Sequence, residues 1–494
     1  MRDPLDRMLH WCDRQPDQPA VVEDSRTVTY GEFGVLVRRL AGAIADAAGA
    51  DEPRVLVHLP QGGDAYAAMF ATLMAGGYYA PVDVTAPPER QARIVAGFAP
   101  TVVVTAPPLP THVAEHAVAA KVINLASLPG TELNSACAPA RLAYVIFTSG
   151  STGEPKGVMI TRSGLAHYTA WAGEAMAVVP GDRWSQHPNI AFDLSVLDIY
   201  GALCWGATLY PISNRKDRLL PGDFVRRHRL TIWDSVPSVI DLMRRAGQAT
   251  AAQLSSLRLA TFCGEPLLTE HLDALFAANP ALTVHNTYGP TEATVSCTLV
   301  RLNAQNFRAA CGASVALGAA IPGMSLDLVG GEGPEEGEIV LSGSQLADGY
   351  WQQPQRTSQS FVQMDLRSQQ TRVYRTGDWA AYRDGHLYFV SRTDRQVKIH
   401  GHRLELGEVE AALRGAGAIA ACAVLSRGEL HAFVEGMRRE GLQDLHGQLV
   451  RRLPAYAMPA HIHVVERFPR NANDKIDVAA LARTLEGSPA EAIQ

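Results

Sequence analysis

The sequence has few cysteines, and none of them lies in a metal-binding arrangement. Its 494 residues include seven cysteines, an odd number, and no two of these have the Cys-x-x-Cys spacing. Disulfide frameworks and structural zinc sites use paired or clustered cysteines. The sequence therefore indicates neither of them, and we expect a protein of the reducing cytoplasm.

Long apolar runs and an excess of positive charge are also missing. No segment reaches the roughly 18 consecutive apolar residues of a membrane-spanning helix, and the charged N-terminal segment has no apolar signal core. Lys and Arg total 44 against 50 Asp and Glu, which gives a formal net charge of −6. Proteins that bind nucleic acids neutralise phosphates with basic residues, so we expect neither a nucleic-acid nor a membrane partner.

The first two thirds of the chain have an α/β pattern. Residues 31–48 place apolar side chains at a spacing of three to four, which predicts an amphipathic helix. Short β-rich runs then alternate with helical patterns, and this alternation predicts largely parallel sheets. The predicted strands are Arg54–Leu59, Thr101–Thr105, Lys121–Asn124, Leu142–Phe147, Thr231–Asp234, Leu257–Phe262 and Leu282–His285.

The pattern changes twice after that region. Between about residues 315 and 390, short strands punctuated by glycine and proline predict an antiparallel barrel or sheet without a long helix. Periodic segments at Leu406–Leu413 and Leu442–Leu453 then predict helices. Because 494 residues exceed what one hydrophobic core can hold, we predict an α/β domain with a barrel-like subdomain over 1–393 and a small α+β domain over 394–494.

The strongest local signal is a loop rich in glycine and hydroxyl side chains. Glycines let the backbone approach a phosphate, hydroxyls and amides donate hydrogen bonds, and a lysine supplies compact positive charge. The spacing is not that of a Walker A loop, because Glu154 and Pro155 separate Gly153 from Lys156. A flexible surface turn is the alternative. The predicted phosphate-binding residues are Thr148, Ser149, Gly150, Ser151, Thr152, Gly153 and Lys156.

The sequence of this loop, TSGSTGEPKG, resembles the phosphate loop of the adenylate-forming superfamily, which includes acyl-CoA synthetases, luciferases and peptide-synthetase adenylation domains. Nine further blocks of that family follow its order and cover essentially the whole chain. They are VTYGEF (28–33), LMAGGYYAPVD (73–83), FDLS (192–195), NTYGPTE (286–292), GEIVLSG (337–343), YRTGDW (374–379), SRTDRQVKIHGHRLELGEVE (391–410), LPAYAMP (453–459) and NANDKID (471–477).

The resemblance implies an ATP site. Tyr288 would stack on adenine, Thr291 would contact the α-phosphate, and Glu292 would bind Mg²⁺. Asp378 would accept hydrogen bonds from both ribose hydroxyls, and Arg392 would contact the nucleotide. Taken alone, these residues also suit ordinary turns. Outside the phosphate loop, the implied ATP-binding residues are Gly264, Glu265, Asn286, Thr287, Tyr288, Gly289, Pro290, Thr291, Asp378, Arg392 and Lys475.

Catalysis is implied for Lys475 together with Thr291 and Glu292. The matching lysine of the family bridges the substrate carboxylate and the α-phosphate, two like charges that need a cation between them. The sequence has Asp474 and Ser391 where the family usually has glycine, and a carboxylate beside Lys475 weakens its phosphate contact. Asp394 matches the hinge about which the small, mobile C-terminal domain of the family rotates.

The sequence around the predicted substrate pocket resembles that of D-alanine–carrier protein ligases and related stand-alone amino acid adenylation enzymes. In amino-acid-activating members the aspartate matching Asp193 pairs with the α-ammonium group, whereas a helix N-cap is the alternative role. Asp234 would pair with a side-chain ammonium or hydroxyl, which favours serine or a short diamino acid over alanine, unless the strand register differs by one residue. The implied pocket lining is Asp193, Leu194, Leu197, Asp234, Thr261, Cys263, Thr287, Val295, Ser296 and Lys475.

Together these observations predict an ATP- and Mg²⁺-dependent enzyme that activates a small amino acid as its adenylate. No carrier-domain serine motif is found, so a separate phosphopantetheinyl carrier protein is the expected acceptor. It would dock at a local basic cluster such as Arg438–Arg439 or Arg451–Arg452. Coenzyme A as the acceptor, and a catalytically silent nucleotide-binding protein, are the alternatives. We expect a monomer, although the sequence leaves the oligomeric state open.

Overall fold

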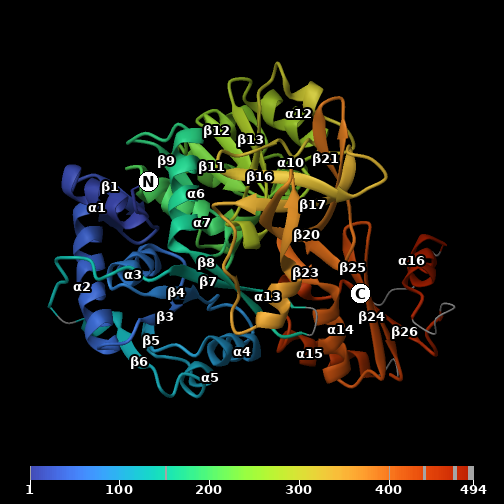
Figure 1. The fold of residues 1–494 in the computed structure, drawn as a ribbon, viewed down its shortest axis with the longest axis horizontal. Helices are drawn as coiled ribbons and strands as arrows, with labels where there is room; N and C mark the ends of the chain where they lie inside the picture. The colour runs from blue at the N-terminus through green and yellow to red at the C-terminus, as the bar shows by residue number, and fades with distance from the viewer. Residues whose placement is uncertain are drawn as a thin grey trace. The chain divides into compact units, whose positions relative to one another are not determined.

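The computed structural model describes residues 2–128, 130–150, 153–399, 401–437, 441–470 and 476–487. It divides the chain into two compact units, drawn in Figure 1. Unit 1 consists of Met1–Val84, Phe98–Phe147 and Gly157–Thr393, and unit 2 consists of Thr85–Gly97, Thr148–Lys156 and Asp394–Gln494. The assignment of 1–393 and 394–494 to two functional domains stays a prediction.

A large sheet of unit 1 positions most of the candidate site. Its strand order in the described residues is β15-β14-β13-β12-β11-β9-β10-β1-β2. The strands from β13 to β1 are parallel, whereas β2, β14 and β15 at the two edges are antiparallel. The strands are β1 (Pro19–Val22), β2 (Thr27–Thr29), β9 (Arg183–Gln186), β10 (Thr208–Pro211), β11 (Ile232–Ser235), β12 (Leu259–Phe262), β13 (Thr283–Tyr288), β14 (Thr298–Leu302) and β15 (Ala319–Ala320).

A second sheet has the order β18-β8-β7-β4-β3-β5-β6. Its central strands pair in parallel, and β18 joins β8 in antiparallel fashion. Both sheets bear out the α/β pattern predicted from the alternation of short strands and helices. The strands are β3 (Arg54–His58), β4 (Tyr78–Pro81), β5 (Val102–Thr105), β6 (Lys121–Asn124), β7 (Leu142–Thr148), β8 (Lys156–Thr161) and β18 (Gly349–Tyr350).

Helices pack on these sheets through their apolar faces. The predicted helix at 31–48 is α2, which begins in a capping box between Thr29 and Glu32 and buries Phe33, Val37 and Ile44. The helices of unit 1 are α1 (Pro4–Arg14), α2 (Tyr30–Ala48), α3 (Gly63–Met74), α5 (Thr111–Ala114), α6 (Arg162–Ala175), α7 (Leu194–Leu203), α8 (Arg215–Leu219), α9 (Gly222–His228), α10 (Pro237–Arg245), α11 (Ala251–Leu254), α12 (Thr269–Ala278) and α13 (Pro354–Ser360).

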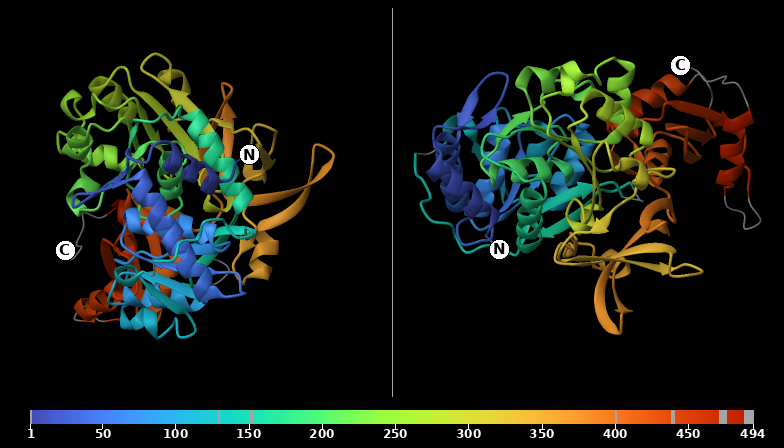
Figure 2. Two further views of the ribbon diagram at one scale, coloured as in Figure 1. Left: turned by 90° about the vertical axis from the view of Figure 1, so that its left-hand side faces the viewer. Right: turned by 90° about the horizontal axis from the view of Figure 1, so that it is seen from above.

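The Gly- and Pro-punctuated region forms the antiparallel sheet that the sequence predicts. Strands follow the order β16-β17-β20-β19, and β21 pairs with the long strand β20. Figure 2 shows this sheet in yellow to orange. The strands are β16 (Met324–Gly330), β17 (Glu336–Gly343), β19 (Phe361–Leu366), β20 (Gln369–Arg383) and β21 (His386–Arg392).

Unit 2 has an α+β structure with its own apolar core. A buried ion pair between Arg90 and Glu408 joins α4 to α14, although burial still raises the pKa of Glu408. None of the described helices is both long and apolar enough to cross a membrane. The elements are α4 (Pro88–Phe98), β22 (Gln396–Ile399), β23 (His402–Glu405), α14 (Leu406–Gly415), β24 (Ala420–Ser426), β25 (Glu429–Glu435), α15 (Leu442–Val450), β26 (His461–Val465) and α16 (Val478–Gly487).

Candidate active site

Predicted pocket residues of neighbouring strands share one face of the large sheet. Asp234 of β11 lies opposite Thr261 of β12 in the parallel register. Because successive side chains of a strand point to opposite faces, Trp233 and Phe262 point the other way, and their rings pack edge to face with centroids 5.3 Å apart. The register that the sequence left open is therefore fixed, with Asp234 on the same face as Thr261.

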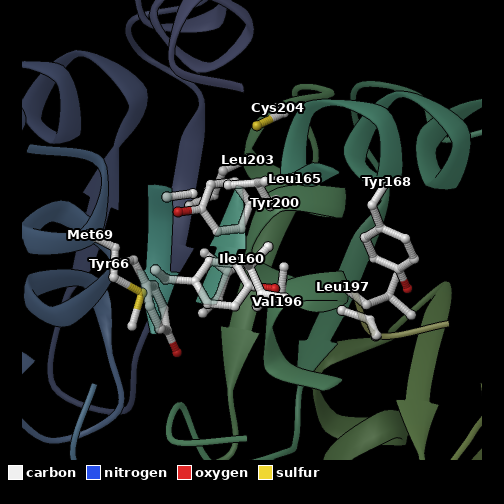
Figure 3. Packing of buried hydrophobic residues seen from close by; sticks show 14 of the residues in the cluster. Tyr66, Met69, Ile160, Leu165, Tyr168, Val196, Leu197, Tyr200, Leu203 and Cys204 are labelled. Carbon is white, nitrogen blue, oxygen red and sulfur yellow. The ribbon is translucent and has the colours of Figure 1, made fainter. Parts of the chain in front are cut away.

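Tyr168 of α6 lies among the predicted pocket residues. It is 1% exposed, and its hydroxyl is 3.2 Å from Oγ of Ser296. Burial raises the pKa of Tyr168 well above its usual range, and Cys263, Asp234 and Asp193 lie near enough to raise it further. Figure 3 shows its ring projecting from α6 toward the side on which Leu197 of α7 lies. Residues from four separate segments thus meet around one phenol.

Asp234 is a buried carboxyl group that lies beside a second one, Asp198. Oγ1 of the neighbouring Thr261 is buried without a hydrogen-bond partner among the described residues. Burial, reinforced by the Asp198 carboxyl, raises the pKa of Asp234 well above its usual range. Asp198 is anchored by the indole of Trp184 at 2.9 Å and the amide of His187 at 3.1 Å. Burial and the closeness of the two carboxyls thus disfavour their charged forms, and the pKa of Asp198 is raised as well.

Asp193 occupies the N-cap position of α7 but does not cap it. Its backbone has helical angles (φ −65°, ψ −24°), and its side chain makes no capping hydrogen bond with the first turn. Capping, the alternative role considered from the sequence, is thus not the role of this carboxylate in the structure. Leu194 and Leu197 on the following turn are buried. Burial, followed by Tyr79 and the charge of Asp193, raises the pKa of the nearby Tyr144.

The segment after β13 has an unusual backbone. Thr294 and Val295 are both in the left-handed region, with φ of 54° and 69°, which is costly for β-branched residues and is concentrated at functional sites. The chain turns back so tightly that a Cβ on Gly289 would lie 2.5 Å from Cα of Ser296. Glycine is therefore required at 289, and the turn brings both ends of the segment together.

Gln345 holds this segment in place. Its side chain is fully buried, and Nε2 donates to the carbonyl oxygens of Ala293, Thr294 and Ser296 at 3.1, 3.3 and 2.9 Å. Its Oε1 lies 2.8 Å from Nδ1 of His167. The two N–H groups of one amide thus satisfy three buried carbonyls, which otherwise carry a desolvation cost.

Three of the predicted nucleotide residues meet at one carboxylate. The Tyr288 hydroxyl donates to Oδ2 of Asp378 at 2.6 Å, and the Arg392 guanidinium bonds Oδ1 of Asp378 and the Thr376 carbonyl, the latter at 3.1 Å. Burial, followed by the Asp378 charge, raises the pKa of Tyr288. The amide of Cys297 donates to the Tyr288 carbonyl at 2.8 Å, so the nucleotide side adjoins the pocket segment.

Other predicted nucleotide-binding residues hold the backbone around this site in place. Asn286 donates to the Ala316 carbonyl at 2.8 Å, Thr287 donates to the Phe262 carbonyl at 3.2 Å, and Glu265 accepts from the amide of Ser238 at 2.9 Å. Gly264 has a φ of 92°, which favours glycine. Pro290 begins the short 3-10 turn Thr291–Ala293.

Glu292 is the predicted Mg²⁺ ligand. Its carboxylate is fully buried and accepts a hydrogen bond from the Tyr350 hydroxyl at 2.8 Å. A single carboxylate suits Mg²⁺, which takes its remaining ligands from water and substrate phosphates. The donor set of Glu292 with the neighbouring Thr291 hydroxyl therefore fits this ion.

The phosphate loop belongs to unit 2, where it packs on β23. Ser149 donates through Oγ to the Arg403 carbonyl at 2.8 Å and accepts from the Glu405 amide at 3.2 Å. Oγ1 of Thr148 is buried without a partner among the described residues, and Lys156 is 1% exposed. The loop closes through a 3.0 Å bond from the Gly153 amide to the Gly150 carbonyl.

Several predicted residues cannot be placed. Ser151, Thr152, Lys475 and its neighbour Asp474 lie outside the described residues, as does the Arg438–Arg439 cluster. Asp394 is exposed, and its Oδ1 accepts from the amide of Gln396 at 3.1 Å at the start of β22. The roles of Lys475 as catalyst and of Asp394 as hinge remain predictions.

Comparison with known proteins decides the family. The AMP-binding enzyme family matches residues 8–351. The chain belongs to this family. AMP-binding enzymes use ATP, and the resemblance read from the ten sequence blocks is confirmed.

The relatives of this AMP-binding enzyme match along its whole length. It is 33% identical to the L-proline–[L-prolyl-carrier protein] ligase of Pseudomonas fluorescens, over 98% of this chain and 99% of the relative. It is 30% identical to the D-alanine–D-alanyl carrier protein ligase of Listeria monocytogenes, over 97% and 98%. The structure of the Vibrio cholerae adenylation domain AlmE with glycyl-adenosine-5'-phosphate has a TM-score of 0.84 at 27% identity and covers 98% of both chains.

Sequence reasoning missed four residues of this site. Tyr168, Asp198, Gln345 and Tyr350 lie outside its predicted set, yet each contacts a member of that set or is coupled to one. Asp198 lies directly after Leu197 in FDLSVLD, so a second carboxylate five residues after Asp193 was a signal that could have been used.

Proposed function

We propose that this AMP-binding enzyme activates a small amino acid with ATP and loads it onto the phosphopantetheine thiol of a separate carrier protein. In the first step a substrate carboxylate oxygen attacks the α-phosphorus, an O–P bond forms, and the bond to the β-phosphate breaks to release pyrophosphate. In the second step the thiolate attacks the acyl carbon and AMP leaves. Relatives that are amino acid–carrier protein ligases over the whole chain length support this proposal.

The observation that supports the proposal most directly is that one short segment, residues 288–296, contacts both the nucleotide side and the amino acid side of the candidate site. Tyr288 contacts Asp378, the predicted ribose partner, whereas Ser296 contacts Tyr168 beside Asp193. A short folded segment thus adjoins both the nucleotide side and the amino acid side. In this proposal Asp193 pairs with the α-ammonium group and so orients the carboxylate toward the α-phosphate.

The side chain of the amino acid is expected to be short and to end in a hydroxyl or amino group. Oγ1 of Thr261 is buried beside Asp234 without a hydrogen-bond partner among the described residues, and a polar group of the ligand would remove this penalty. Because burial raises the pKa of Asp234 and so disfavours its charged form, a neutral hydroxyl suits it as a partner.

The proposed roles of the remaining residues come from the family resemblance. Glu292, with the Thr291 hydroxyl, would hold Mg²⁺, which neutralises phosphate charge when bound. Lys475 would lie between the carboxylate and the α-phosphate, carried by a C-terminal lid of residues 394–494 that turns about Asp394 over a core of residues 1–393. All seven cysteines are free thiols, which fits a cytoplasmic location.

The test is amino-acid-dependent exchange of labelled pyrophosphate into ATP. The panel is serine, 2,3-diaminopropionate, glycine, proline and both alanines, and we expect exchange to be highest with serine or the diamino acid. Asp193→Asn should lower exchange at least about 100-fold because it removes the ammonium partner, while ATP binding by calorimetry is retained. Asp365→Asn, on the exposed part of β19, is the matched control and should not change exchange.

Acceptor specificity is tested by mass spectrometry with the preferred amino acid. A phosphopantetheinylated carrier protein should gain the mass of one aminoacyl group, whereas coenzyme A should not. Exchange with none of the amino acids would refute amino acid activation. Aminoacyl-coenzyme A as the main product would refute carrier loading.

A further inference from the structure

Unit 2 carries a group of histidines on its three-stranded sheet. The sheet has the order β24-β25-β26, and β25 and β26 run parallel with His431 opposite His461 and Phe433 opposite His463. Alternate residues of a strand share a face. Glu429 and His431 of β25 therefore project from the same face as His461 and His463 of β26.

The four side chains are in close contact. The rings of His431 and His461 stack with centroids 4.7 Å apart. Nδ1 of His431 lies 3.1 Å from Nε2 of His463, and Nε2 of His461 lies 3.1 Å from Oε2 of Glu429. Ligand atoms of Glu429, His431 and His461 all lie within 4.8 Å of one another.

The surroundings of the group suit a cation rather than an apolar contact. Nδ1 of His461 is buried without a hydrogen-bond partner among the described residues, whereas the Glu429 side chain is 59% exposed.

We propose that Glu429, His431 and His461 bind a transition-metal ion of the Zn²⁺ type, with His463 orienting His431. Imidazole nitrogen and carboxylate oxygen are ligands that Zn²⁺ prefers, and a second imidazole often fixes the ring of a ligating histidine. Tetrahedral bonds of about 2.0–2.1 Å place the ligand atoms roughly 3.3 Å apart. The rings of His431 and His461 stack at 22°, and a nitrogen lone pair lies in its ring plane. Binding one ion therefore requires one of these rings to rotate out of the stack, together with rotation of the exposed Glu429.

The ion would join β25 to β26 where both strands begin. These strands are separated in sequence by α15, so the site closes a long loop of the smaller unit. Because an ion that binds only the folded site stabilises it, Zn²⁺ is expected to raise the unfolding temperature of unit 2. The site is independent of the adenylation chemistry proposed above.

The described residues contain a second cluster of carboxylates with a histidine, and it differs from the group on β25 and β26. Asp241, Glu270 and His271 also lie close together, but Arg244 contacts both carboxylates at 3.0 and 3.6 Å. Nδ1 of His271 accepts a hydrogen bond from the amide of Leu268 at 3.2 Å. That cluster is satisfied by a cationic side chain, whereas in the described part of the chain Glu429 pairs with His461 and with no arginine or lysine.

Titration of the metal-free full chain with Zn²⁺ under reducing conditions tests the proposal. Calorimetry should find one equivalent bound by the wild type that is lost in the His431→Gln, His461→Gln double variant. His463→Gln should weaken binding about 10- to 100-fold, as loss of an orienting partner does. His446→Gln, an exposed histidine of α15, is the matched control.

Two further measurements separate binding at this site from adventitious binding or misfolding. Circular dichroism without metal should show the same folded signal for all variants. Thermal unfolding should show a Zn²⁺-dependent rise for the wild type and His446→Gln but not for the double variant. Equal stoichiometry and affinity in wild type and double variant, or the same thermal shift in both, would overturn the proposal.

Discussion

Replacing Gln345 with methionine tests whether this residue shapes the amino acid pocket. Methionine has a similar length but no N–H donor, so the change removes the bonds to three backbone carbonyls without opening a large cavity. The affected segment contains Thr294 and Val295 in left-handed conformations. Each of these residues stores about 1–3 kcal/mol of strain that its surroundings must hold in place.

The expected magnitude follows from the hydrogen bonds. Two amide donors are lost, and a buried carbonyl left without a donor costs about 1–3 kcal/mol. The cost is about 2–6 kcal/mol if the segment stays rigid and less if it relaxes. Relaxation would release the strain at Thr294 and Val295 and displace Ser296 from Tyr168. Taking the lower bound of about 2 kcal/mol, kcat/KM for the amino acid should fall about 30-fold.

The assay is pyrophosphate exchange with the amino acid varied, together with calorimetry of ATP binding. ATP affinity should change less than about fivefold, which is the equivalent of one buried hydrogen bond of about 1 kcal/mol, because the Tyr288 to Asp378 bond is untouched by this substitution. Gln363→Met on exposed β19 is the matched control. If Gln345→Met retains wild-type kcat/KM and unfolding temperature, Gln345 does not position the segment and the reasoning is refuted.

Two further predictions concern the nucleotide side and the buried acid pair. Tyr288→Phe removes the donor to Asp378 and should weaken ATP binding about 5- to 10-fold, since such a bond is worth about 1–1.5 kcal/mol; unchanged affinity by calorimetry would show that this bond does not order the site. Asp234→Asn should raise the unfolding temperature more at pH 7 than at pH 4.5. The pKa of Asp234 is raised in the folded state, so the folded protein binds the proton more tightly and wild-type stability declines as pH rises above about 4. A difference that is independent of pH would contradict this assignment of the proton.

Much of the fold was predictable because it depends on local patterns. The helix at 31–48 has an apolar stripe and a capping box, and the strand Lys121–Asn124 has the same bounds in the structure as in the prediction. The predicted helix Leu442–Leu453 is shorter, since α15 ends at Val450. Arg452 instead donates its amide to the Leu449 carbonyl in a turn. Differences of a few residues at helix ends are expected, because the end is fixed by tertiary contacts.

The candidate site was predictable where one short block carries its chemistry. Tyr288 and Asp378 were both singled out from their motifs, and the structure joins them by a hydrogen bond. Tyr168 and Gln345 were not, because each lies in an unremarkable segment and reaches the site only when α6 and the chain after β17 pack beside the pocket. No periodicity or spacing marks such a residue in a single sequence.

By itself the sequence determined the α/β architecture, the family and the residue types available for binding, because those properties depend on short-range patterns. Only the tertiary structure decided which side chains meet. Strand register placed Asp234 beside Thr261 and His431 beside His461, and burial raised the pKa of Asp234. Register and burial arise from contacts between residues that are far apart in the chain, and this is why one sequence read alone does not contain them.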